Sequence, residues 1–146
     1  MNSRTFFYEL GKSLYGIDGF YAEYAKKFDV KENLLWILYA LNDGEKHSQK
    51  EICDSWDLPR STVNTIIKEL EVGGYVFFSQ IKGEKRELNV TLTKAGKKYA
   101  EELLGGLYEI EKRVFENFKT SDLLSELQRI REELYGQENN IKKEMK

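Results

Sequence analysis

The chain has 146 residues, with 40% hydrophobic and 33% charged side chains and a formal net charge of −2, which is typical of a globular domain able to bury its own core. Its apolar runs fall short of the ~20 residues that cross a bilayer, and its first residues lack the apolar segment of a secretory signal. With one Cys and one His, it cannot form an internal disulfide or a structural zinc site. We therefore expect a cytoplasmic protein without a membrane span, metal or cofactor.

The N-terminal third predicts two helices. Over residues 4–28, apolar side chains recur at steps of three and four, the period of one helix face. Three glycines inside this helix each cost ~1 kcal/mol relative to alanine, so packing against a partner must stabilise it. Residues 31–42 predict a second, strongly apolar helix that ends at Asn42-Asp43-Gly44.

The next segment predicts a helix, a tight turn and another helix. Ser48 to Glu51 is a capping-box pattern, in which Ser48 caps the helix and Glu51 reaches back, and it opens a short helix ending near Trp56. Pro59 suits the first turn of the following helix, which extends to about Val72 before Gly73-Gly74. In that second helix four apolar residues share one face and predict a buried stripe: Val63, Ile66, Ile67 and Leu70.

The opposite face of the 59–72 helix carries directional hydrogen-bonding groups. Asparagine matches adenine, arginine matches guanine, and hydroxyl groups serve either base. A helix-turn-helix places its second helix in the major groove, so we predict base contacts by this face. Its members are Arg60, Ser61, Thr62, Asn64, Thr65 and Lys68. The alternative is that these side chains only cap the helix and face solvent.

Residues 75–81 and 87–93 are rich in β-branched and aromatic side chains and flank a charged turn, which predicts a β-hairpin. A basic hairpin after a recognition helix makes a winged helix, and Lys82, Lys85 and Arg86 in its turn are expected to grip the DNA backbone or the minor groove. Ser48 and Gln49 are expected to touch phosphate. From residue 59 to 98 the sequence has eight basic and four acidic residues, whereas the rest has 15 basic and 21 acidic. This local positive charge favours nucleic acid as the partner.

The C-terminal third again predicts helices. Thr93 can cap a helix over 94–118, which Gly105-Gly106 interrupts, and residues 121–135 form a last helix before a tail that frays. The first and last helices have more apolar side chains than one small core can cover, which predicts a homodimer. Two recognition helices then require a pseudo-palindromic operator with half-sites ~10 bp apart. The alternative is that both helices pack within one monomer.

Residues 30–98 resemble the MarR family of bacterial transcriptional regulators. The resemblance rests on "SQKEICDSWDLPRSTVNTIIKELEVGGYV" at 48–76 and "LTKAG" at 92–96. The family's wing Asp-x-Arg falls on Glu84-Lys85-Arg86, where Arg86 matches the DNA-contacting arginine and Glu84 replaces the aspartate. The resemblance implies a mainly α fold with a small antiparallel β wing. It further implies a single domain over 1–146, with a DNA-binding lobe at about 30–98 and dimerisation helices at about 4–28 and 99–135.

In this family a cleft beside the dimer helices often binds phenolic or amphipathic effectors, which implies effector contacts by Tyr15, Phe20, Trp36 and Tyr39 here. The alternative for these aromatic side chains is the core. We interpret Cys53 as a packing residue and His47 as a solvated loop residue.

The sequence lacks the nucleophile–base pair, phosphate-binding glycine loop and metal cluster that enzymes use, so we expect no enzyme. The expected function is a sequence-specific DNA-binding repressor released by a small molecule. The alternative is a winged-helix module that binds another protein.

Overall fold

The computed structural model describes residues 1–119 and 121–146. It divides into two compact units, Met1–Glu109 and Ile110–Lys146. The elements in chain order are α1 (Ser3–Lys27), α2 (Glu32–Leu41), β1 (His47–Ser48), α3 (Gln49–Trp56), α4 (Arg60–Val72), β2 (Val76–Gln80), β3 (Leu88–Leu92), α5 (Lys94–Phe115) and α6 (Leu123–Glu144). This mainly helical fold with a small antiparallel sheet confirms the predicted fold class. Within the described residues, no helix is both long enough and apolar enough to span a membrane.

Local capping explains where the helices of the first unit begin and end. The Ser48 hydroxyl accepts the Glu51 backbone N–H at 3.0 Å and so caps α3, as the sequence predicts. Pro59 is the residue before α4 and not part of its first turn. After α4, Gly74 adopts the left-handed φ of 78° that glycine tolerates best, and the Tyr75 N–H donates to the Leu70 carbonyl at 2.8 Å.

The hairpin is confirmed, and it belongs to a three-stranded sheet with the order β1-β3-β2. Strands β2 and β3 pair antiparallel, from Val76 opposite Leu92 to Gln80 opposite Leu88. The two-residue strand β1, which the sequence analysis misses, pairs with β3 through His47 opposite Val90. The interpretation of His47 as a loop residue is therefore wrong. Too short for a period-two pattern, β1 is recognisable only from its pairing with β3.

The core of the first unit lies among the C-terminal part of α1, α2, α3, α4, the sheet and α5. All four residues of the predicted α4 stripe are buried, with Val63 and Ile67 fully inaccessible. On the sheet, Val90 and Leu92 face the same core. Because α4 buries one face completely, its opposite face is free for another role.

The prediction that Gly105-Gly106 interrupts a helix is wrong, because α5 is continuous from Lys94 to Phe115. The space beside Gly106 is needed by α1. The Tyr24 hydroxyl donates a 2.8 Å hydrogen bond to the Leu103 carbonyl, and a Cβ at Gly106 would lie only 3.2 Å from that hydroxyl oxygen. This glycine therefore permits the close approach of two helices.

In the second unit, α6 continues to Glu144, so the expectation of a frayed tail after residue 135 is wrong. Glu138 and Lys142 form an i,i+4 ion pair at 2.9 Å, in the order that favours a helix, and two lysines lie in the last turn beside the negative helix end. Thr120, inside the segment 99–135 predicted for dimerisation, lies outside the described residues.

Candidate nucleic-acid interface

The face of α4 opposite the buried stripe presents polar groups to solvent, most of them uncharged. Ser61, Asn64, Thr65 and Lys68 are exposed, and Thr62 is half-buried. The Thr65 hydroxyl donates to the Ser61 carbonyl at 2.9 Å, which fixes its rotamer and leaves its oxygen lone pairs as acceptors. The face therefore offers donors and acceptors in defined directions on a rigid element.

Arg60, the first residue of α4, forms an ion pair with a residue outside α4. Its guanidinium Nη2 forms an ion pair with Oε1 of Glu87, the residue just before β3. The Arg60 side chain is 60% exposed and the Glu87 side chain 22% exposed. Because 27 positions separate the two residues, local sequence patterns could not identify Glu87 as a site residue.

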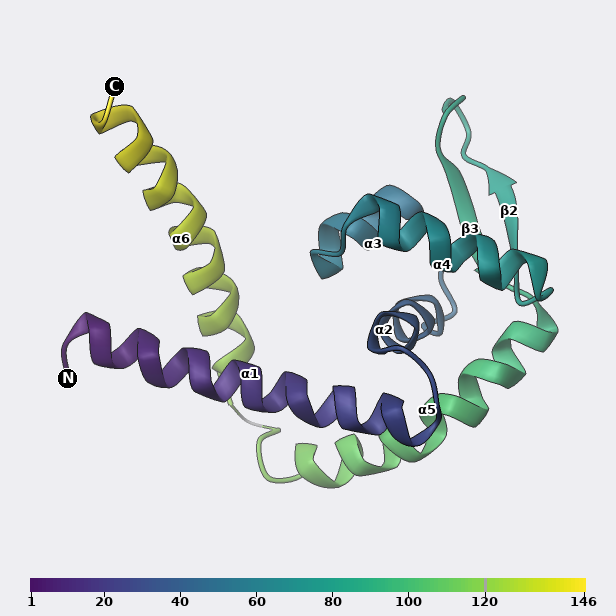
Figure 1. Cartoon of the computed structure of the whole chain (residues 1–146), viewed down its shortest axis with the longest axis horizontal. Helices are drawn as coiled ribbons and strands as arrows, with labels where there is room; N and C mark the ends of the chain where they lie inside the picture. Colours follow the sequence, from purple (N-terminus) through teal and green to yellow (C-terminus); the bar gives the residue numbers. More distant parts are fainter. Residues whose placement is uncertain (120) are drawn as a thin grey trace. The chain divides into compact units, whose positions relative to one another are not determined.

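The basic residues of the wing lie in the turn between β2 and β3. Gly83 has φ of 85°, and the Glu84 N–H donates to the Ile81 carbonyl at 3.0 Å, so these two features shape the turn. Three cationic side chains in it are exposed: Lys82, Lys85 and Arg86. The hairpin projects beyond α4 (Figure 1). The wing turn therefore lies away from the α4 face, within the same unit.

The predicted phosphate contacts lie where β1 joins α3. Both Ser48 and Gln49 are half-buried. The Ser48 hydroxyl is occupied as the helix cap. The Gln49 side-chain oxygen is buried and has no hydrogen-bond partner within the described part of the chain. The backbone N–H groups at the start of α3 are therefore better placed than these side chains to meet a phosphate.

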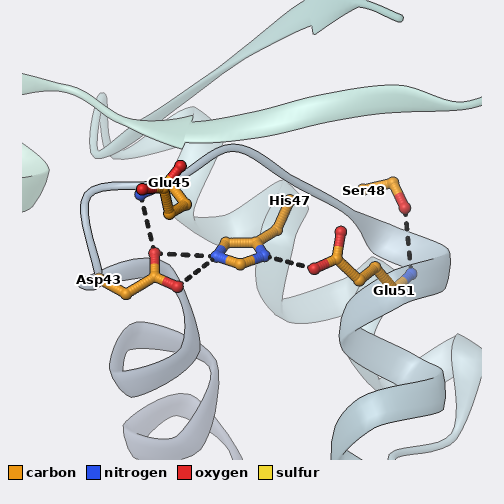
Figure 2. A network of polar contacts seen from close by, with 5 residues as sticks. All are labelled: Asp43, Glu45, His47, Ser48 and Glu51. Carbon is orange, nitrogen blue, oxygen red and sulfur yellow. Dashed lines mark hydrogen bonds and ion pairs between the residues drawn. The ribbon is translucent and has the colours of Figure 1, made fainter.

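A histidine between two carboxylates joins the end of α2 to the start of α3 (Figure 2). His47 Nε2 lies 2.8 Å from Asp43 Oδ2, and His47 Nδ1 lies 2.8 Å from Glu51 Oε1. The His47 side chain is 16% exposed, so the predicted solvated position is wrong. The Glu51 carboxylate, predicted to reach back to the cap, contacts this ring. Burial lowers the pKa of His47, but the hydrogen bonds that its ring donates to Asp43 and Glu51 outweigh burial, so the net pKa is raised.

This network predicts a pH dependence of stability. Because the folded-state pKa of His47 is raised, its contribution is complete below the ordinary histidine pKa of 6.5 and is lost as pH rises through the folded value. Between pH 6 and pH 8.5 the wild type should lose unfolding free energy relative to His47→Gln. Urea denaturation across this range measures the difference, and parallel curves for the two proteins would contradict it.

The predicted effector residues are brought together only in part. The Trp36 ring contacts the Tyr21, Trp56 and Tyr39 rings, with centroids 4.6, 5.2 and 5.7 Å away. Tyr39 and Trp56 line a pocket of about 270 Å³ together with Asp43, His47 and Glu51.

The other two predicted effector residues lie on α1. Phe20 reaches the aromatic cluster through the Tyr21 ring, at 5.3 Å, whereas Tyr15 is 81% exposed. Trp56, which the sequence analysis does not assign to an effector site, lies in the cluster because α3 folds against α2.

Cys53 is half-buried against the core, and burial raises the pKa of its thiol. A raised pKa disfavours the thiolate, the reactive form, so this environment is that of a packing residue.

Comparison with known proteins agrees with this geometry. A model of the MarR family matches residues 29–87, which include α2, the helix-turn-helix and the wing turn. The transcriptional regulator SarZ of Staphylococcus epidermidis is 27% identical over 113 residues, covering 74% of each chain.

Two solved structures share the fold. One is NMB1585, a MarR family regulator from Neisseria meningitidis, with a TM-score of 0.81, 26% identity and coverage of 96% of this chain and 99% of that chain. The other is reduced AbfR bound to DNA, with a TM-score of 0.67, 21% identity and coverage of 91% of this chain and 94% of that chain. The α4 face, the wing and these matches together lead to one assignment: residues 29–87 match the MarR family of transcriptional regulators, and the chain shares the fold of a MarR family regulator.

Proposed function

We propose that two copies of this chain bind a pseudo-palindromic operator in double-stranded DNA, with α4 of each copy in the major groove. The observation that carries the proposal is the two-sided character of α4, which buries Val63 and Ile67 completely while it exposes Asn64 and Thr65. Groups with directional hydrogen bonds can distinguish base pairs, which charge alone cannot do. The proposed major-groove contacts are Arg60, Ser61, Thr62, Asn64, Thr65 and Lys68.

The proposed phosphate contacts surround this face. Lys82, Lys85 and Arg86 lie exposed in the wing turn, where they can neutralise backbone charge. Ser48 caps α3 and Gln49 is its first residue, and the N-terminal N–H groups of α3 favour an anion. In this proposal the wing and the start of α3 orient α4 on the duplex.

Dimerisation is supported by a stripe on α1 that extends past the core of the first unit. Positions 7, 10, 14, 17, 21, 24 and 28 follow steps of three and four and so share one face. Within the stripe Tyr24 is 8% exposed, but Phe7, Leu14 and Ile17 are 45, 46 and 59% exposed. In the second unit, α6 has no buried residue and exposes Leu123, Leu124 and Leu134. A second copy of the chain is the proposed cover for these apolar side chains.

We propose further that the protein is a cytoplasmic repressor whose operator binding is weakened by a small phenolic or amphipathic effector. The pocket of about 270 Å³ beside Tyr39 and Trp56 is large enough for a small aromatic molecule. Trp36 lies against both rings, with Phe20 and Tyr15 further along α1. An effector in this pocket weakens operator binding only if it favours a conformation in which the two recognition helices are wrongly spaced for DNA.

The alternative of a protein-interaction module is less well supported by α4. A helix that docks on a protein usually offers an apolar face to a groove, whereas the free face of α4 is polar. The net positive charge of the 59–98 segment likewise favours DNA as the partner.

Selection of duplexes from a random pool, followed by mobility-shift titration, tests the proposed function directly. Recovery of a symmetric motif with two half-sites is the expected result. Failure to retain any duplex at 100 mM salt, or equal binding of all duplexes, would contradict specific DNA recognition.

Asn64→Ala should lower affinity for the selected operator at least tenfold and change affinity for random DNA by less than twofold. The reason is that an asparagine–adenine pair discriminates between bases by ~1–3 kcal/mol and contributes no charge. Titration of both duplexes with the same preparation measures the difference. An equal loss on both duplexes would refute a base-reading role.

Arg86→Ala should weaken binding to operator and to random DNA by similar factors. Since the arginine is proposed to contact phosphate, the magnitude of the slope of log binding constant against log salt concentration should decrease by about 1 per subunit. Lys12→Ala, which removes a basic side chain from α1, is the control and should leave the slope unchanged. An unchanged slope for Arg86→Ala would exclude the wing contact.

A further inference from the structure

We infer that Glu87 holds Arg60 in the orientation that reads DNA, and that this carboxylate thereby sets the sequence discrimination of α4. The inference rests on the proposed DNA-binding function and adds to it a residue outside the contact face. Glu87 is a positioning residue, because its effect on DNA passes through the Arg60 guanidinium.

The geometry behind this inference is an ion pair between two different elements. Arg60 is the first residue of α4, and Glu87 immediately precedes β3 at the base of the wing. Nη2 of Arg60 contacts Glu87 Oε1. Because a guanidinium has five N–H donors, this contact leaves donors available for a ligand. With 22% exposure, Glu87 is the more fixed partner, whereas Arg60 remains 60% exposed and accessible to a ligand.

Such an exposed pair contributes little to folding stability, because solvent screens it and the long side chains lose freedom. The effect of this ion pair on DNA binding is larger than its effect on folding stability. A guanidinium that is already oriented loses less conformational entropy when it meets a base edge, and its planar fork then matches guanine in one geometry. A freely rotating arginine would instead bind any nearby phosphate.

The charge of Glu87 has a second effect, on the overall strength of DNA binding. Within residues 59–98 it is one of four acidic residues among eight basic ones, and it lies beside the proposed contact face. A carboxylate there reduces the sequence-independent attraction of phosphates. Discrimination between operator and random DNA therefore depends on Glu87 through the orientation of Arg60, whereas the charge of Glu87 weakens binding to both duplexes.

The test compares Glu87→Gln, Glu87→Asp and Glu84→Gln in mobility-shift titrations on the selected operator and on random duplex. The ratio of the two affinities should fall about tenfold in Glu87→Gln, because Arg60 is no longer held in one orientation. Glu87→Asp keeps the charge but shortens the reach, so it should lower the ratio about fivefold. Glu84→Gln makes the same charge change in the wing turn and should raise both affinities equally.

A double-mutant cycle separates positioning from simple charge. In an Arg60→Ala background, Glu87→Asp should leave the affinity ratio unchanged, because the group it positions is absent. Circular dichroism and thermal melting verify that each variant is folded.

Equal effects of Glu87→Gln and Glu84→Gln, or an unchanged ratio in Glu87→Asp, would overturn the inference while specific binding by the wild type stands. If the wild type itself selects no sequence, the proposed function fails first.

Discussion

Ile17→Glu is expected to convert the proposed dimer into a monomer and to lower operator affinity at least 100-fold. Ile17 is 59% exposed in the α1 stripe, whereas Tyr24 of the same stripe packs in the core. A carboxylate at this position would have to be desolvated in a dimer interface, which is costly without a partner. A monomer binds one half-site only and loses the ~10²–10⁴-fold gain of linked binding.

Sedimentation equilibrium at micromolar concentration and mobility-shift titration measure the two parts of this prediction. Lys12→Glu is the control, because it adds more negative charge on the opposite side of α1. It should remain dimeric and bind the operator within a few-fold of the wild type. The dimer model would be wrong if the wild type sediments as a monomer, or if Ile17→Glu remains a dimer.

Gly96→Ala is expected to destabilise the folded protein by about 3 kcal/mol or more, because it overpacks a site that has no room. A Cβ at Gly96 would lie 1.9 Å from the Tyr75 carbonyl oxygen and 3.2 Å from Leu92 Cδ2. That carbonyl accepts the Thr93 N–H at 2.9 Å, and the Thr93 hydroxyl accepts the Gly96 N–H at 3.0 Å. The added methyl group must therefore push apart the start of β2 and the cap of α5.

Urea denaturation monitored by circular dichroism measures this loss. Gly105→Ala, in the same helix, is the matched control, since a Cβ there has no atom within 4 Å. It should leave stability unchanged or raise it by up to about 1 kcal/mol, because alanine favours a helix more than glycine does. Equal stability of Gly96→Ala and the wild type would show that the junction can rearrange without cost.

Patterns between neighbouring residues were enough to predict most elements of this fold. The spacing of Val63, Ile66, Ile67 and Leu70 identifies both the buried and the free face of α4, because a helix repeats every 3.6 residues. Caps are equally local, and the Ser48 hydroxyl bonds a backbone N–H only three positions away. The β2–β3 hairpin follows from two strands close together in the chain, and the MarR resemblance of residues 30–98 follows from the order of these same local elements.

Contacts between distant segments were decided by the tertiary structure alone. Strand β1 exists only through its pairing with β3, and Gly106 is needed because Tyr24 crosses it from α1. Glu87 reaches Arg60 only because the wing folds back to the start of α4. Periodicity and capping act over one or two helical turns, so the sequence by itself determined the elements and their faces. Arg60 and Glu87 are 27 positions apart in the chain, and Tyr24 and Gly106 are 82 positions apart. Because packing brings such pairs together, their contacts could be identified only in the folded chain.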